Sequence, residues 1–214
     1  MKLKHRAAGP LAALLLFAAT PAAAQVFGQL SSAEVLPING HEAGFFLNAS
    51  NNTLGGLSQL RLSFYPGIDF GFQGGLSRVS WQGVDRTTLR LGADLRVAVG
   101  HSGEGFPYDI SVGGALGVET SDNYHVLTLM PNAVVSRSWT LGQSGSIAPY
   151  LGLGLSFAHA DAGSTNETFV SLPLRLGADL RVMPGMRLSA EMQTPIGDSF
   201  NDDFGVLTGV KLAF

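Results

Sequence analysis

The sequence FGVLTGVKLAF at residues 204–214 decides the fold. Every second position holds one of the larger, mostly apolar residues: Phe204, Val206, Thr208, Val210, Leu212 and Phe214. Gly205, Leu207, Gly209, Lys211 and Ala213 stand between them. A period of two predicts a β-strand with one apolar face. Such a strand, running to a terminal Phe, fits the wall of a barrel that turns its apolar side to lipid.

The opposite end of the chain has the pattern of a secretory signal peptide. Lys2, Lys4 and Arg6 precede an apolar run at 11–19, and small residues at 22–24 come before Gln25. We therefore expect export and cleavage after Ala24. A lipoprotein anchor is not expected because no Cys follows. No later apolar stretch is long enough for a membrane helix, so a membrane-embedded mature chain would cross as strands.

Composition narrows the classes of function. The predicted signal peptide contains three of the 13 basic residues and none of the 16 acidic ones, so the mature chain is acidic and nucleic acid is not an expected partner. The absence of Cys excludes disulfides, thiolate nucleophiles and thiolate metal sites. Charged residues form only 14% of the chain, which is low for a water-exposed surface.

Turn signals divide residues 41–214 into ten alternating segments. They lie near 42–50, 57–65, 68–80, 87–99, 108–119, 124–138, 147–159, 167–182, 186–196 and 204–214. This pattern predicts an all-β, antiparallel, up-and-down transmembrane β-barrel of about ten strands, with eight as the alternative. Residues 25–40 are left open as an N-terminal extension, a plug or an extra strand.

The connections between these segments differ in length. Pro66-Gly67 and residues 183–185 indicate tight turns, whereas 51–56, 160–166 and 197–203 are longer and polar. With the C-terminus on the periplasmic side, the tight turns fall there and the longer links lie outside the cell.

A nine-residue repeat, LRLGADLRV at 89–97 and again at 174–182, separates the two faces of a strand. Aliphatic residues occupy one face, and Arg, Gly and Asp occupy the other. A soluble barrel would bury the aliphatic face, whereas a membrane barrel would bury the charged one. Glycines favour the membrane barrel, because they lie on the polar face. A strand face exposed to water would gain nothing from Gly, whereas a crowded lumen gains space for other side chains. They are Gly71, Gly75, Gly92, Gly113, Gly117, Gly152, Gly154, Gly177, Gly205 and Gly209.

Aromatic residues lie near both ends of the predicted strands and suggest two interfacial belts. The periplasmic belt would contain Phe64, Tyr65, Trp139 and Phe214. The outer belt would contain Trp81, Tyr124, Phe157, Phe169 and Phe204.

The export signal, the alternating strands, the run PYLGLGL at 149–155 and the terminal VKLAF at 210–214 resemble small outer-membrane barrels of the OmpA-transmembrane, OmpW and opacity-like type. The resemblance implies contact with outer-membrane lipid and lipopolysaccharide, and insertion by the outer-membrane assembly machinery. In that family the machinery reads the last strand, here Val210, Leu212 and Phe214. Family members usually have eight strands, so the count of ten departs from them. We expect a monomer.

The face assignment places a set of charged residues inside the lumen. They are Arg61, Asp69, Arg90, Asp94, Arg96, Glu119, Arg175, Asp179, Arg181, Arg187, Glu191 and Lys211. Strand register predicts three groups: Asp69 with Arg96, Glu119 with Arg90, and Glu191 between Arg175 and Arg181. The structural interpretation is an ion-pair lattice that fills the barrel. The functional one is a narrow passive pore, weakly attractive to anions.

Catalysis has weaker support in the sequence. The candidate residues are His41, His101, His125 and His159, with Asp161 and Asp85 at the outer rim, as in an omptin-like hydrolase. A lipid A deacylase would need His101 and Ser102 on the other side of the membrane. No spacing collects three metal ligands, and Asp198, Asp202 and Asp203 fit a solvated loop. We expect no catalytic residue, metal or cofactor. Adhesion through the outer loops is the alternative function.

Overall fold

The computed structural model describes residues 30–81, 83–103, 105–142, 145–197 and 204–214. The predicted signal peptide and residues 25–29 lie outside this part. The regular structure of the described residues consists of strands: β1 His41–Ser50, β2 Thr53–Tyr65, β3 Ile68–Trp81, β4 Val84–Gly100, β5 Asp109–Ser121, β6 Tyr124–Ser136, β7 Trp139–Leu141, β8 Gly145–Gly154, β9 Ser156–Ala162, β10 Thr165–Met183, β11 Met186–Gly197 and β12 Gly205–Ala213. The described residues contain no helix that is long and apolar enough to cross a membrane.

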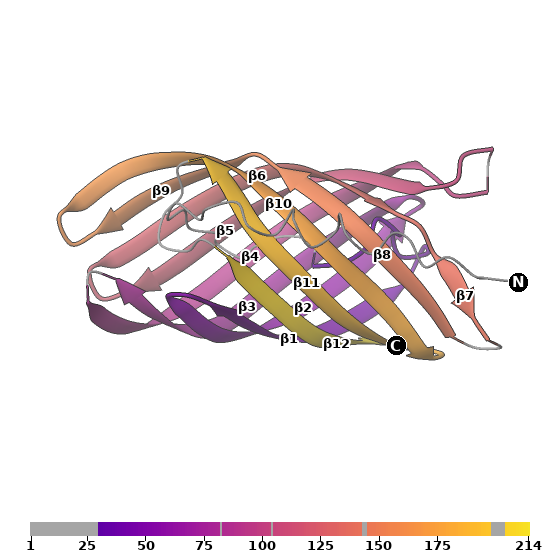
Figure 1. Ribbon diagram of the computed structural model, residues 1–214, viewed down its shortest axis with the longest axis horizontal. Coiled ribbons are helices and arrows are strands. Elements are labelled where there is room, and N and C mark those ends of the chain that lie inside the picture. Colours follow the sequence, from indigo (N-terminus) through magenta and orange to yellow (C-terminus); the bar gives the residue numbers. More distant parts are fainter. Residues whose placement is uncertain (1–29, 82, 104, 143–144, 198–203) are drawn as a thin grey trace, which may run out of the picture.

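The strands close into a single barrel (Figure 1), because β12 pairs with both β11 and β1. Strands β8 and β9 share one position in the wall, since both lie between β6 and β10. The short β7 pairs with β8 just after β6 ends. The wall therefore has ten antiparallel strand positions, which confirms the predicted count of ten.

The two ends of the barrel differ in their connections. At one end, called the C-terminal rim, lie Phe214, the Pro66-Gly67 turn, the Pro184-Gly185 turn and the longer link at 101–108. Gly67 and Gly185 have φ of 72° and 77°, which a Pro-Gly turn of type II requires. The other end, called the distal rim, carries the turns at 51–52, 122–123 and 163–164.

Two of the three predicted distal links are shorter than the sequence suggested, and the third, 197–203, lies almost entirely outside the described residues. The predicted links at 51–56 and 160–166 are turns of two residues, since β2 begins at Thr53 and β10 at Thr165. The polar and glycine residues that looked like loop sequence are strand residues: Gly55, for example, pairs with Asn48 on one side and Ser77 on the other. Beyond the apolar band both faces of a strand can be polar, so the alternation fades before the strand ends.

The aliphatic face of the wall points outward. Leu91 and Leu176, in the two copies of the repeat, are 51% and 52% exposed, whereas their neighbours Arg90 and Arg175 are each 1% exposed. Soluble proteins seldom expose an apolar band that continues around the molecule. The charged face is therefore the interior, and the soluble-barrel alternative is excluded.

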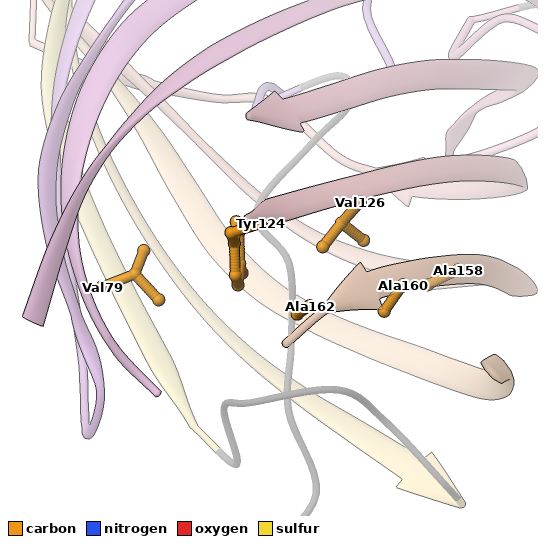
Figure 2. Packing of buried hydrophobic residues seen from close by; sticks show 6 residues of the cluster. All are labelled: Val79, Tyr124, Val126, Ala158, Ala160 and Ala162. Carbon is orange, nitrogen blue, oxygen red and sulfur yellow. The ribbon is translucent and has the colours of Figure 1, made fainter. Parts of the chain in front are cut away.

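The predicted outer aromatic belt is wrong for Trp81, Tyr124 and Phe169, whose side chains turn into the lumen. Tyr124 belongs to a buried cluster near the distal rim, together with Val79, Val126, Ala158, Ala160 and Ala162 (Figure 2). Trp81 and Phe169 pack against this cluster. Counting in steps of two would have shown this, since Trp81 shares its face with Asp69 and Phe169 with Arg175. At the C-terminal rim, Phe64, Tyr65, Trp139 and Phe214 are exposed as expected.

Candidate functional site: a charged lumen occupied by residues 30–36

Glycines in the wall make room for the long charged side chains inside. A Cβ added to Gly71 would lie 2.1 Å from Asp94 Oδ2, and one added to Gly177 would lie 2.4 Å from the Tyr150 ring. Any larger residue at these positions would displace the side chain opposite. Close packing against long side chains of the neighbouring strand thus explains these two glycines of the polar face.

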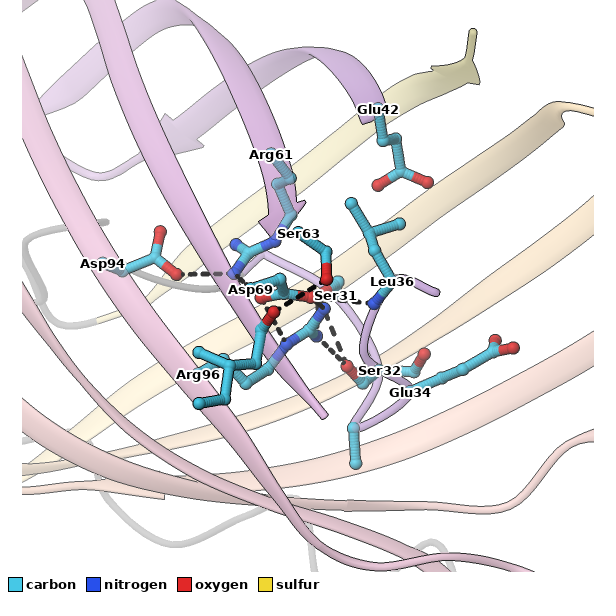
Figure 3. A network of polar contacts seen from close by, with 12 residues as sticks. Ser31, Ser32, Glu34, Leu36, Glu42, Arg61, Ser63, Asp69, Asp94 and Arg96 are labelled. Atoms are coloured by element: carbon cyan, nitrogen blue, oxygen red, sulfur yellow. Dashed lines mark hydrogen bonds and ion pairs between the residues drawn. The ribbon is translucent and has the colours of Figure 1, made fainter. Parts of the chain in front are cut away.

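The largest group of charges joins β2, β3 and β4 (Figure 3). Arg61 Nη2 lies 2.6 Å from Asp69 Oδ1 and 2.8 Å from Asp94 Oδ1. Arg96 Nε donates to Asp69 Oδ1 at 3.1 Å, as the paired register of β3 and β4 requires. Two guanidinium groups and two carboxylates therefore neutralise one another away from water.

Two further groups hold other parts of the wall together. Arg90 Nη2 lies 3.1 Å from Glu119 Oε2, and Thr88 Oγ1 donates to Glu119 Oε1 at 2.7 Å. On the other side, Asp179 Oδ1 accepts from Lys211 Nζ at 2.8 Å and from Ser189 Oγ at 2.6 Å. Each carboxylate thus links neighbouring strands.

Glu191 has partners other than the arginines proposed from register. Its carboxylate accepts from Tyr150 Oη at 2.7 Å and from Gln193 Nε2. The register is nevertheless as expected, since Glu191 faces Gly177, between Arg175 and Arg181. Sequence reasoning missed Tyr150 because it lies on β8. This strand pairs with one edge of β10, whereas β11 pairs with the other edge.

Arg175 is a buried cation without a hydrogen bond in the described part of the molecule. None of its three guanidinium nitrogens has a hydrogen-bond partner among the described residues, although Arg175 is only 1% exposed. It lies against Gly152 on β8, whose added Cβ would be 3.0 Å from Arg175 Nε. An ionised group with neither water nor a partner lowers stability.

We expect Arg175→Met to raise the free energy of unfolding by about 2 kcal/mol, because it removes an unpaired buried charge and keeps most of the volume. The matched control is Arg90→Met, at equal burial, which should lower that free energy by about 3 kcal/mol because Glu119 loses its cation. Urea titration in lipid vesicles, followed by Trp fluorescence, measures both. Equal destabilisation by the two substitutions would show that Arg175 is paired in the membrane.

The lumen also holds the segment that precedes β1. Ser32 N–H donates to Asp179 Oδ2 at 3.0 Å, and Leu36 N–H donates to Asp69 Oδ2 at 3.0 Å. Arg96 Nη1 donates to the Ser32 carbonyl oxygen at 2.5 Å and to Ser31 Oγ at 2.6 Å (Figure 3). The charges of the wall therefore bind the backbone of residues 30–36.

A small apolar pocket receives the first described residue of this segment. Leu30 is 1% exposed and packs against Phe46, Leu57 and Leu207, from β1, β2 and β12. The sequence offered one signal for this contact: Leu57 and Leu207 are large apolar residues on an otherwise polar face. Their partner was not identifiable, because Leu30 lies in a stretch without alternation.

The C-terminal rim opens into a cavity of about 870 Å³, called the vestibule, which residues 34–38 help to line. Arg187 Nη2 lies 3.5 Å from Glu34 Oε2, and Arg187 Nη1 lies 4.0 Å from Glu42 Oε2. Arg181 Nη2 approaches Glu34 Oε1 at 3.9 Å. Arg181 and Arg187, predicted inside the lumen, thus lie at its mouth in longer and more exposed ion pairs.

Above the vestibule the charged layer excludes water. Each of its basic residues is only 1% exposed: Arg61, Arg90, Arg96, Arg175 and Lys211. Asp69, Asp94, Glu119, Asp179 and Glu191 are between 0 and 5% exposed. Side chains that line an aqueous path would be wetted along it, so the barrel is closed at this level.

The hydrolase candidates are not assembled into one site. His159 Nδ1 lies 3.1 Å from Thr168 Oγ1 on the outer face, and Asp161 is exposed on the same face. Asp85 lies on β4, three strand positions away, which is about 14 Å at ordinary strand spacing. There it pairs with Arg78 and Ser80.

Of the remaining candidate residues, His101 lines the vestibule, and the other three have local partners. His125 Nδ1 lies 2.8 Å from Thr120 Oγ1, and Ser102 donates through N–H and Oγ to Asp109. His41 stacks on Phe214, with ring centroids 5.7 Å apart. Within the described ranges, no group of three or more His, Asp and Glu residues could hold a metal ion. The acidic loop that contains Asp198, Asp202 and Asp203 lies outside those ranges.

The three residues proposed as an assembly signal lie on the outer face of β12 or just after it. Leu212 is 42% and Phe214 74% exposed. Val210 pairs with Phe45 of β1, and the Phe214 N–H donates to the His41 carbonyl at 3.2 Å.

Comparison with solved structures identifies the class of fold. The barrel is similar to an outer membrane channel from Pseudomonas putida F1, with a TM-score of 0.53, 12% identity, and coverage of 89% of this chain and 100% of that chain. It is also similar to the beta domain of the Bordetella autotransporter BrkA, with a TM-score of 0.50, 12% identity, and coverage of 82% and 99%. No protein-family model and no curated protein sequence matches the chain. The protein thus has the fold of outer-membrane β-barrels, without a narrower family being established.

Proposed function

We propose that this protein is a non-enzymatic barrel of the bacterial outer membrane, exported by its N-terminal signal. Its lumen acts as a narrow passive pathway that residues 30–36 close from within. The C-terminal rim faces the periplasm and the distal rim faces outward. The outward aliphatic band, which only a lipid environment would tolerate, supports the location.

One observation carries the proposed closure: Ser32 is held from two nearly opposite walls. Its carbonyl accepts from Arg96 on β4, while its N–H donates to Asp179 on β10, four strand positions away around the ring of ten. The segment therefore spans the lumen at the level of the charged layer. Its removal would leave carboxylates and guanidinium groups facing open space, which water and ions would enter.

The alternatives have less support in the geometry. Adhesion would use the distal rim, where the described turns at 51–52, 122–123 and 163–164 are only two residues long. A rim hydrolase would need His159 and Asp85 together, and they lie on separated strands. A purely structural barrel remains the competing interpretation, and it predicts that the lumen stays closed without the segment.

Deleting residues 25–36 should convert a silent barrel into a conducting one in planar bilayers. The parent, reconstituted in the same way, should show no steady conductance, because its charged layer is closed. The deletion should give small, stable openings, with selectivity set by the uncovered charges. Both proteins must run as folded barrels on unheated gels. A folded but silent deletion variant would favour the structural role.

A further inference from the structure

Residues 30–36 are held mainly through groups that every peptide has. Asp179 and Asp69 accept from backbone N–H groups, and Arg96 donates to a backbone carbonyl. A fourth backbone contact comes from β6, because Ala33 N–H donates to Ser136 Oγ at 3.1 Å. The lumen thus presents acceptors and a donor at spacings that match a polypeptide backbone.

Side chains of the segment meet complementary parts of the lumen. Leu30 fills the apolar pocket, and the small residues Ser31, Ser32 and Ala33 fit where the barrel is tightly filled, each at most 4% exposed. Glu34 then reaches the arginines of the vestibule. The order apolar, small, small, small, acidic therefore describes what the site accepts.

We propose that the lumen is a peptide-binding site, occupied in this state by the protein's own residues 30–36. Its ligands are peptides with an apolar residue, three small residues and an acidic residue in that order, bound in the bent conformation of residues 30–36. The vestibule, open at the C-terminal rim, is the route of entry. This inference deepens the proposed function, on which it rests, since the same segment would close the pathway and compete with ligand.

Synthetic peptides test the site without altering the wall. The probe is fluorescein-labelled LSSAEVLPIN, the sequence of residues 30–39. It should bind saturably to barrels that lack residues 25–36 and should not bind the parent, whose site is filled. N-methylation at Ser32 removes the donor to Asp179 and should weaken binding at least about tenfold.

Two further peptides serve as controls. N-methylation at Val35, whose N–H makes no hydrogen bond in the described part of the chain, should change binding less than about threefold. Replacing Leu30 by Ala in the peptide should weaken binding about tenfold through loss of apolar burial. Equal affinities of the two N-methylated peptides, or no binding to a folded deletion variant, would overturn the proposal.

A second protein variant covers the case in which the deletion prevents folding. Ser32→Pro in the full chain removes the donor to Asp179 and weakens the internal segment, so the labelled peptide should bind this variant and not the parent. Absence of binding to this folded variant would overturn the site. Conductance is recorded on the same samples: an open barrel that ignores the peptide refutes the peptide site alone, whereas a silent barrel that binds it refutes the pathway alone.

Discussion

Asp69→Ala should lower the free energy of unfolding by about 3–5 kcal/mol, the usual cost of breaking a buried ion pair from one side. Asp69 is 0% exposed and neutralises two guanidinium groups, those of Arg61 and Arg96. It also accepts the Leu36 N–H. The substitution therefore removes one carboxylate partner from each of the two arginines. It also removes the hydrogen bond that holds the Leu36 N–H of the internal segment. Urea unfolding in lipid vesicles measures the effect.

The control for this prediction is Asp85→Ala at the distal rim. Asp85 also accepts from an arginine, Arg78, but that ion pair is open to solvent, with side-chain exposures of 48% and 69%. Because water screens an exposed ion pair, it contributes little to stability. The unfolding midpoint of Asp85→Ala should therefore equal that of the parent within experimental error. Similar losses for both substitutions would mean that the lumen of the folded barrel is wet. The ion-pair lattice would then not be what stabilises it.

The arrangement of the strands was predictable because alternation carries so much information in a barrel. The ten predicted segments correspond to the ten strand positions. The repeat at 89–97 and 174–182 separated the two faces, and the glycines indicated that the polar face is the interior. Register followed from pairing neighbouring segments, which places Asp69 opposite Arg96 and Arg90 opposite Glu119. These contacts lie between strands adjacent in sequence, where the geometry of a hairpin leaves few choices.

Contacts beyond a single strand pair were not predictable in the same way. Tyr150 reaches Glu191 over 41 residues, and Ser32 reaches Asp179 over 147. Neither contact follows from hairpin register, because the first joins strands that are not paired and the second involves a segment outside the wall. The occupancy of the lumen by residues 30–36 therefore needed the structure. Arg175 illustrates the same limit. Register suggested Glu191 as its partner, but the Glu191 carboxylate accepts from Tyr150 and Gln193 instead.

Deleting Phe214 should reduce the amount of assembled barrel in the outer membrane about tenfold, with little change in synthesis. The side chain is 74% exposed and makes one stacking contact, with His41. Its loss removes almost no buried area, so the stability of barrels already folded should change little. A large assembly defect would therefore report recognition of the terminal Phe during insertion, as the resemblance to small outer-membrane barrels implies.

Phe64→Ala separates recognition from a general need for aromatic residues at the interface. Phe64 lies at the same rim and is 53% exposed, so it has a similar surface role. If the rim aromatics act only as interfacial anchors, the two variants should assemble equally well. We expect Phe64→Ala to reach nearly parental levels, measured as the heat-modifiable band in isolated outer membranes. Refolding both proteins from urea into vesicles without assembly machinery should abolish the difference, because the last strand then needs no receptor to pair with β1.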